Sequence, residues 1–182
     1  DSTIINALAE TSILLNNATL FLNSTDDTIK CKVLQLLTIV CVLSTYEHRH
    51  KTVTNALVYH QQYYHIDSSC YKVLVDNLVI NRNITLKNDV LTFINVLLSS
   101  DIEIETRVTI RTQLQQHGID KRIDEIRTWL LSSNINDSTA YELCMDNIDN
   151  YILQQKNDKS EVAFDKLDLS DIQQVSDYLI QH

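Results

Sequence analysis

Two segments of the chain are apolar at almost every position, and both predict buried helices. One runs from about residue 29 to 43, directly after the cap-forming cluster Asn-Ser-Thr-Asp-Asp at 23–27, and the other runs from about 84 to 99. A helix that is apolar on all sides must be covered on several sides. Each segment is therefore predicted to lie inside the protein with other helices packed around it.

The two apolar segments also match each other. Residues 36–43 (LLTIVCVL) and residues 90–97 (VLTFINVL) agree in residue type position by position, with threonine third and valine seventh in both. Each stretch is followed by a polar break and then by an amphipathic helix. A recurring unit of one buried helix with covering helices is typical of an α-solenoid of armadillo or HEAT type. A compact helical bundle is the alternative that this pattern leaves open.

Amphipathic segments predict further helices between and after the apolar ones. They are expected at about 46–65, 69–80, 103–117, 120–131 and 136–155. Gly118 is a natural end for the helix at 103–117, because glycine readily adopts the left-handed conformation that closes a helix. In the last helix the residues expected to face inward are Tyr141, Leu143, Ile148, Tyr151 and Ile152. Residues 156–182 are more polar and are expected to form an arm, with a final helix capped at Ser170-Asp171.

Glycine and proline are almost absent, and this narrows the fold class. The 182 residues include one glycine and no proline. Tight strand turns usually need these residues, and phosphate-binding loops need several glycines close together, so sheet proteins, P-loop NTPases, Rossmann enzymes and kinases are excluded. The sequence predicts an all-α protein: an armadillo-repeat α-solenoid over 1–133 and a C-terminal helical arm over 134–182.

Charge and cysteine content limit the partners and the compartment. Fifteen basic and 24 acidic residues give a formal net charge of −9, and the basic residues are scattered, so nucleic acid and anionic membranes are not expected as partners. The four cysteines are Cys31, Cys41, Cys70 and Cys144. They lack Cys-x-x-Cys spacing and are expected to be buried and reduced, as in a cytoplasmic protein.

Residues that could support catalysis or metal binding are present without the required spacing. Neither the pair His48 and His50 nor the set His60, His65 and Cys70 has a recognised zinc spacing, so the histidines are expected to be exposed to solvent. The acidic residues at 101, 103 and 105 stand at a predicted helix start, where carboxylates complement the helix dipole. No enzymatic activity, metal or cofactor is expected.

Several polar residues interrupt the apolar helices, and they suggest a binding surface. Gln35, Asn88, Thr92 and Asn95 stand where burial would favour a large apolar side chain. A buried asparagine without hydrogen-bond partners costs about 1–3 kcal/mol. These side chains are therefore expected at the rim of an open groove, where they can bond to the backbone of a bound peptide. The alternative is that neighbouring loops satisfy them.

One helix carries a family resemblance. The run from Ile104 to Leu114 (IETRVTIRTQL), ending in Gly118-Ile119, resembles a signature of diaphanous-related formins, an Arg-Val-x-Ile-Arg-x-x-Leu helix that closes with a Gly-Leu or Gly-Ile step. The preceding residues 93–97 (FINVL) are similar to the family's Ile-Asn-Ala-Leu helix. Residues 143–151 resemble the segment where the family passes from its repeats to its dimerisation region. The resemblance covers most of residues 1–155.

The resemblance implies the armadillo-repeat regulatory region that lies ahead of the actin-assembling domain of these formins. In the family, this region binds an autoregulatory helix from the C-terminus of the same protein and so prevents actin assembly. The implied partners are a Rho-family small GTPase in its GTP state, which releases the inhibition, the protein's own C-terminal autoregulatory segment, and actin through other domains of the full-length protein. The resemblance also implies a full-length homodimer, located in the cytoplasm at the actin cytoskeleton and cell cortex. The alternative function is a general armadillo-type adaptor for an unrelated protein.

Carried over position by position, the resemblance places the autoregulatory helix across six residues: Gln35, Ile39, Val42, Asn88, Thr92 and Asn95. Each trio is spaced i, i+4, i+7, which puts its members on one face of a helix and fits a helix docked in a groove. Ile39 stands where the family often has alanine, and Gln35 where it often has lysine. The N-terminal repeats, which make most of the family's GTPase contacts, are expected to be missing from this sequence.

Overall fold

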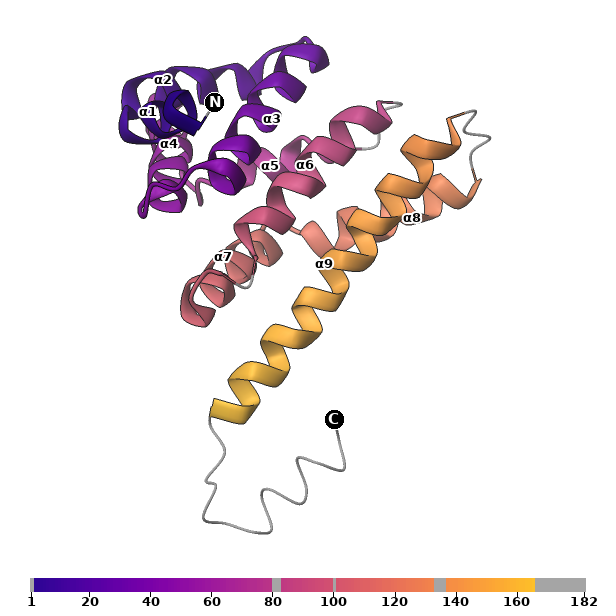
Figure 1. The fold of residues 1–182 in the computed structure, drawn as a ribbon. Coiled ribbons are helices and arrows are strands. Elements are labelled where there is room, and N and C mark those ends of the chain that lie inside the picture. The colour runs from indigo at the N-terminus through magenta and orange to yellow at the C-terminus, as the bar shows by residue number, and fades with distance from the viewer. Residues whose placement is uncertain (1, 80–82, 100, 133–136, 166–182) are drawn as a thin grey trace.

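Helices make up all the regular structure in the part of the chain that the computed structural model describes, residues 2–79, 83–99, 101–132 and 137–165 (Figure 1). They are α1 (Ser2–Glu10), α2 (Ser12–Thr19), the short 3₁₀ helix η1 (Leu20–Asn23), α3 (Asp27–Leu43), α4 (Arg49–Tyr63), α5 (Lys72–Asp76), α6 (Ile84–Leu97), α7 (Ile104–Gln116), α8 (Ile119–Ser132) and α9 (Ser138–Asp165). None of these helices is long and apolar enough to cross a bilayer.

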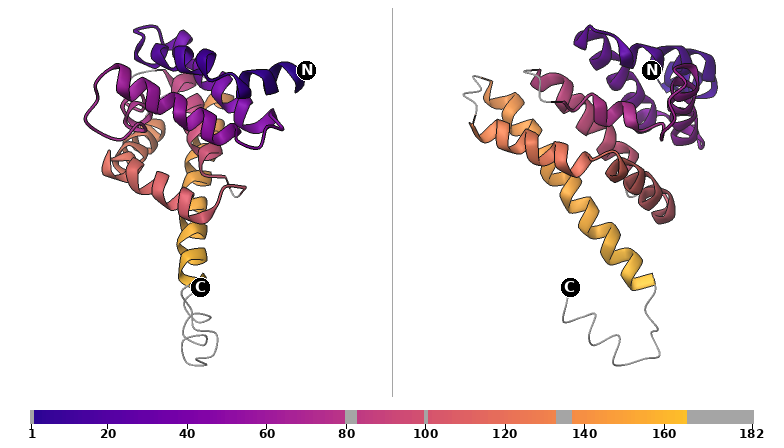
Figure 2. Two further views of the ribbon diagram at one scale, coloured as in Figure 1. Left: turned by 90° about the vertical axis from the view of Figure 1, so that its left-hand side faces the viewer. Right: turned by 180° about the vertical axis from the view of Figure 1, so that it is seen from behind.

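Helices α3, α6 and α9 together form one layer of the structure. α3, α6 and α9 run side by side in the same direction, and α6 packs along α3 on one side and along α9 on the other (Figure 1). α1, α2 and α4 lie beyond α3, while α8 covers the back of α9 (Figure 2). Three sets of three helices, each ending in a helix of the shared layer, form the armadillo-like all-α arrangement that the repeat between 36–43 and 90–97 predicts.

The core follows the two apolar segments. α6 buries residues on nearly all sides, among them Val90, Leu91, Phe93 and Ile94, as predicted. α3 buries Leu34, Leu37 and Val40 but leaves Ile39, Val42 and Leu43 exposed. The prediction that α3 is covered on all sides is therefore wrong for one face, because α6 is its neighbour in the layer on one side only.

Short-range hydrogen bonds set the predicted helix ends. The Asp26 carboxylate accepts from the Thr28 N–H at 2.8 Å at the start of α3, and the Asn83 amide oxygen accepts from the Leu86 N–H at 3.1 Å at the start of α6. Gly118 closes α7 with φ +83°, in the left-handed region, as predicted. These ends are local, so they can be read from a few residues of sequence.

Other boundaries differ from the prediction. Residues 2–23, for which no helix was predicted, form α1, α2 and η1, and α5 is shorter than the predicted segment 69–80. α9 continues to Asp165, ten residues past its predicted end at 155, so residues 156–165 belong to this helix. The expected helix after Ser170-Asp171 lies outside the described residues. The division between 1–133 and 134–182 falls between α8 and α9 and stays a prediction.

A buried cluster of ion pairs fixes the second half of α9 against α7. Asp158, whose side chain is 3% exposed, pairs with Arg107 at 3.3 Å and with Arg111 at 2.7 Å. Arg107 also pairs with Glu161 at 2.6 Å, and the Arg111 guanidinium lies 4.9 Å from the centre of the Tyr151 ring. The residues just after 155 are therefore part of the packed structure, and the expectation of a polar arm starting at 156 is wrong for them.

Burial of single residues confirms one expectation and corrects two. All four cysteines are buried and free, as predicted. His60 is fully buried rather than exposed, with its ring 4.9 Å from that of Tyr64. Leu143, expected to face inward from α9, is 49% exposed, because the buried side of α9 is formed by Cys144, Ile148 and Tyr151.

Candidate functional site

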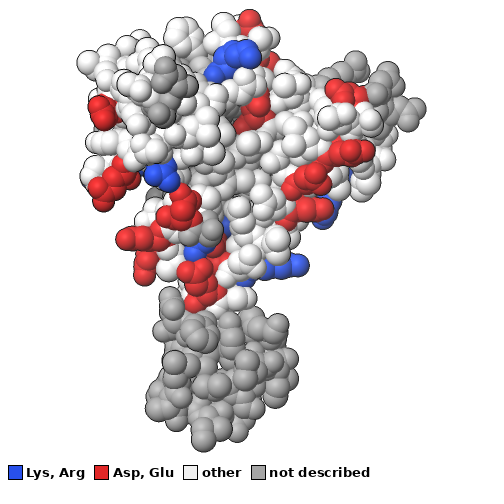
Figure 3. All heavy atoms as spheres, viewed as in Figure 1, with Lys and Arg blue, Asp and Glu red and all other residues white. Residues whose placement is uncertain are grey.

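Exposed apolar side chains gather on one side of the layer formed by α3, α6 and α9. In the space-filling view the surface over these helices carries few charges between its edges (Figure 3). We define the α3–α6–α9 face by Gln35, Ile39, Val42, Asp89, Thr92, Val96 and Leu143. Gln35, Asp89 and Thr92 take part in hydrogen bonds that join neighbouring helices, and the apolar members are exposed or half-buried.

α3 contributes the most exposed apolar residues of this face. Ile39 is 42% exposed and Val42 is 57% exposed. Gln35 lies on the same side of α3, where its amide nitrogen donates to the carboxylate of Asp89 on α6 at 3.1 Å and its amide oxygen accepts from Lys32 at 3.2 Å. The predicted trio on α3 therefore does share one face, and Gln35 links this helix to α6.

The predicted trio on α6 is placed differently from the expectation. Asn88 and Asn95 are 5% and 6% exposed, and their amide nitrogens donate to backbone carbonyls of α9, Asn88 to Ala140 at 3.1 Å and Asn95 to Asn147 at 3.0 Å. The expectation that both lie at the rim of an open groove is wrong, because α9 covers them. Helix α9 provides their hydrogen-bond partners, whereas the alternative expectation was that neighbouring loops would do so.

Thr92 is the member of that trio that reaches the surface. It is half-buried, and its hydroxyl donates to the side-chain oxygen of Asn147 at 3.3 Å. The structure therefore brings Gln35, Ile39, Val42 and Thr92 onto one face, while Asn88 and Asn95 hold α9 in place beneath it. Whether these six residues bind a helix stays a prediction.

Two further apolar residues belong to the face, and the sequence contained a signal for one of them. Val96 is half-buried and is the counterpart of Val42 in the repeated stretch. Leu143 lies one turn before Asn147, which bonds to Thr92, so it projects from α9 beside α6. The repeat alone indicates Val96. Leu143 could be found only by recognising that α9 joins the layer.

The charges at the two edges of the face differ in sign. Lys32 is exposed on α3, whereas Glu142 and Asp146 are exposed on α9, and Figure 3 shows acidic side chains along α9. Asp149, also on α9, is paired with Arg127 at 2.6 Å. A ligand that crosses the face from α3 to α9 therefore meets a basic side chain at the α3 edge and acidic side chains at the α9 edge.

Several buried titratable groups are surrounded by residues of the protein core. Lys87 on α6 is fully buried, with its ammonium group 5.0 Å from the centre of the Trp129 ring, and burial lowers its pKa. Burial also lowers the pKa of His60 and raises the pKa of the Cys41 thiol to about 12. Within the described ranges, no three His, Cys, Asp or Glu side chains gather in a way that could hold a metal ion.

Comparison with known proteins identifies a protein family whose model matches this chain. The family model described as the diaphanous FH3 domain matches residues 50–182, well over half of the chain. The match begins in α4 and includes the Arg-Val-x-Ile-Arg helix, α7, as well as α6, α8 and α9. A search of curated proteins found no match.

Proposed function

The chain belongs to the diaphanous FH3 domain family, the non-catalytic regulatory module of diaphanous-related formins, and from this premise we propose that its α3–α6–α9 face binds an amphipathic helix from the C-terminus of the same protein. When bound to this face, the helix inhibits actin assembly. A Rho-family GTPase in its GTP state releases it.

One observation supports the proposal most directly: the C-terminal half of α3 exposes Ile39, Val42 and Leu43, whereas Leu34, Leu37 and Val40 are buried on its opposite side. Ile39 and Val42 lie one turn apart at 42% and 57% exposure. Their counterparts one repeat later, Phe93 and Val96, are buried and half-buried. Exposed apolar patches on a folded protein mark interaction sites more often than single exposed residues do. An amphipathic helix buries such a patch with residues spaced i, i+3 or i+4.

The spacing of the layer sets the length of the ligand. Packed helices lie about 8–10 Å apart, so the exposed residues of α3 and Leu143 of α9 are separated by roughly 20 Å, two helix spacings. A helix rises 1.5 Å per residue, so a ligand helix that spans the face needs about 13 residues, or nearly four turns. Thr92 and Val96 on α6 lie beneath its middle.

The charge at the α9 edge determines which end of the ligand should carry cationic residues. Glu142 and Asp146 are exposed there and form no ion pair within the described residues. A ligand with cationic residues at the end that lies on α9 is therefore favoured over one with acidic residues there. Its affinity should fall as the salt concentration rises.

The test is a binding titration with a synthetic peptide of the full-length protein's own C-terminal amphipathic helix. Val42→Asp places a carboxylate in the contact without disturbing the core, because Val42 is more than half exposed. We expect this variant to weaken binding by a factor of about 30 or more, since the carboxylate must be desolvated against an apolar ligand. The matched control is Leu131→Asp on α8, where the wild-type leucine is 70% exposed and lies off the face.

The outcomes separate the family function from the alternative. Binding that Val42→Asp abolishes and Leu131→Asp leaves intact supports the proposal. A peptide that binds both variants as tightly as the wild type removes the α3–α6–α9 face from the site. If the C-terminal peptide does not bind at all, the autoinhibitory function is wrong and the general armadillo-type adaptor becomes the better proposal.

The proposed release by a GTPase needs its own test. GTP-loaded and GDP-loaded Rho proteins should differ in affinity for the full-length protein, and the GTP form should displace the C-terminal peptide. Equal affinities would contradict the effector role. The proposal names no GTPase-contact residue in this chain.

Family membership also motivates proposals about the full-length protein. We propose that it reaches actin through other domains, forms a homodimer and is located in the cytoplasm at the actin cytoskeleton and cell cortex. Light scattering before and after removal of residues 166–182 tests the contribution of this segment to dimerisation. Imaging of the tagged full-length protein tests the location, and a uniform distribution independent of actin would contradict it.

A further inference from the structure

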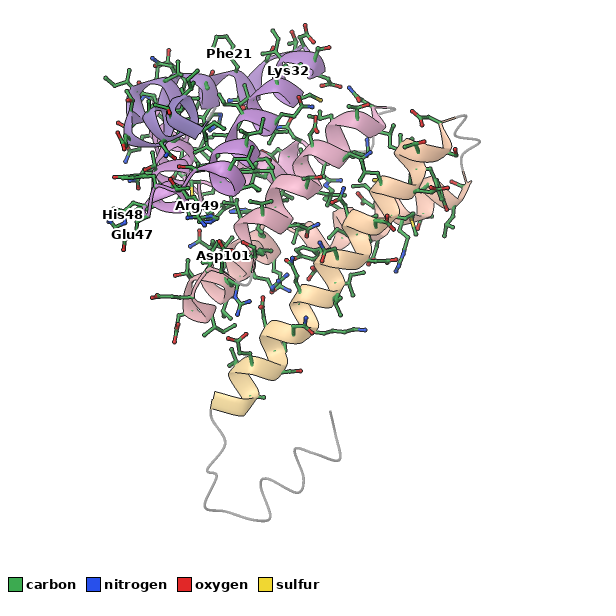
Figure 4. All side chains as sticks on the ribbon, viewed as in Figure 1. Phe21, Lys32, Glu47, His48, Arg49 and Asp101 are labelled. Carbon is green, nitrogen blue, oxygen red and sulfur yellow. The ribbon has the colours of Figure 1, made fainter. Side chains whose placement is uncertain are left out.

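A second surface feature lies away from the α3–α6–α9 face, at the ends of two helix sets. It is a cleft with a volume of about 480 Å³, within the range of ligand sites, between the start of α4 and the start of α7. Glu47 and His48, just before α4, lie on one side of it and Asp101 on the other, and Figure 4 shows Arg49 between α4 and Asp101. We call it the α4–α7 cleft.

One ion-pair network holds the two sides of the α4–α7 cleft together. Asp101 pairs with Arg49 at 3.0 Å and accepts a hydrogen bond from the Ser99 hydroxyl, and its carboxylate lies 3.4 Å from the His50 ring, whose pKa is lowered by burial. Arg49 also donates from Nε to the Cys41 carbonyl at 2.7 Å, which ties it to α3. The Asp101 charge is therefore already neutralised by protein groups, and the width of the cleft is fixed by a contact between residues of successive helix sets.

The remaining acidic groups of the cleft are open to a ligand. Glu47 and Glu103 are exposed at its two sides and form no ion pair with any described residue. Lys51 is the one lysine or arginine among its lining residues. Between these charges, the half-buried Ile102 provides apolar surface, with Leu97 and Ile110 buried behind it. The cleft thus offers an apolar surface flanked by two carboxylates.

We propose that the α4–α7 cleft binds a short peptide segment of a partner protein in which an apolar side chain stands next to lysine or arginine. The apolar side chain packs on Ile102, and the cationic side chain lies between Glu47 and Glu103. The cleft shares no residue with the α3–α6–α9 face. Peptide binding at the cleft and helix binding at the face can therefore be tested independently.

Charge complementarity decides the chemistry of this partner. α4 and α7 both begin at the cleft, and the N-terminal end of a helix attracts negative charge. Glu47 and Glu103 already supply that charge beside the two helix starts, with Glu103 as the cap residue of α7. An acidic ligand would meet both carboxylates, whereas a cationic one meets two unpaired acceptors.

The test is selection from a random peptide library displayed on phage, with the whole chain as bait. Peptides that bind the wild type are counter-selected on the double variant Glu47→Lys/Glu103→Lys. Both positions are exposed, so the double variant should fold, and a circular dichroism melt checks this. Recovered sequences are then synthesised and titrated against the wild type, the double variant and the control Glu10→Lys, which changes an exposed glutamate on α1.

We expect the recovered peptides to combine a leucine, isoleucine or phenylalanine with lysine or arginine. The double variant should bind them about tenfold more weakly or worse, because repulsion replaces attraction at two points, and the control should bind them as the wild type does. Ile102→Ala should also weaken binding. Recovery of acidic peptides, recovery of no peptide, or equal affinity for the wild type and the double variant would overturn the proposal.

Discussion

Replacing Asp158 by asparagine tests whether the second half of α9 is packed as the structure shows. The Asp158 side chain is 3% exposed and is the carboxylate shared by two buried guanidinium groups, on Arg107 and Arg111. Asp158→Asn keeps the size of the side chain and removes its charge. Arg111 then loses its ion-pair partner, while Arg107 keeps the half-exposed Glu161 at 2.6 Å.

The size of the effect follows from what is left unpaired. Removing one partner from a buried ion pair costs about 3–5 kcal/mol. Because Arg107 retains Glu161, we expect the lower end, about 3 kcal/mol of lost unfolding free energy. In a chain of this length each kcal/mol lowers the melting temperature by about 2–4 °C, so the melt should fall by about 6–12 °C.

Urea unfolding followed by circular dichroism measures this loss directly. Asp146→Asn on the same helix is the matched control, because Asp146 is exposed and forms no ion pair in the described ranges; its effect should stay within about 0.5 kcal/mol. Combining Asp158→Leu with Arg111→Met should recover much of the loss, since neither charge is then stranded. A loss below about 1 kcal/mol for Asp158→Asn, the value of a surface pair, would refute the buried cluster.

Three further predictions concern single positions. His60 is fully buried with a lowered pKa, so the unfolded chain binds more protons below about pH 6.5; stability should fall with acidification by up to about 1.4 kcal/mol at pH 5.5 relative to His60→Phe, and parallel urea midpoints for the two proteins would contradict this. Gly118→Ala adds a Cβ that meets no atom within 4 Å, so only the backbone strain at φ +83° should count, about 1–2 kcal/mol in the same assay. Asn95→Ala leaves the Asn147 carbonyl without its buried donor and should cost about 1–3 kcal/mol; an unchanged melt would show that Asn95 does not hold α9.

The parts of the fold that could be predicted from sequence are those that local pattern determines. The capping side chains Asp26 and Asn83 and the closing Gly118 act over a few residues, and the repeat between 36–43 and 90–97 needs only a comparison of the chain with itself. The placement of α9 depends on contacts with residues about 50 positions away. Period and composition do not reveal which helix covers Asn88 and Asn95.

The ion pairs show the same limit. Arg107 and Arg111 are one turn apart on α7, and Asp158 and Glu161 are one turn apart on α9, so each half of the cluster was visible as a spaced pair of like charges. Nothing in the sequence alone joined the two halves. Asp101 is a similar case, since its neighbours suggested a helix-dipole role, whereas its carboxylate bonds to Arg49 of the preceding helix set.

The binding role of the α3–α6–α9 face is the central proposal, and methyl NMR tests it most directly. Ile39, Val42, Val96 and Leu143 each carry a methyl group on this face, and Ile13 and Leu131 provide exposed reference methyl groups elsewhere. On titration with the protein's own C-terminal peptide, we predict that the four face signals shift together and saturate with one affinity, while the reference signals stay in place. Shifts at the reference methyl groups with the face signals unchanged would contradict the account.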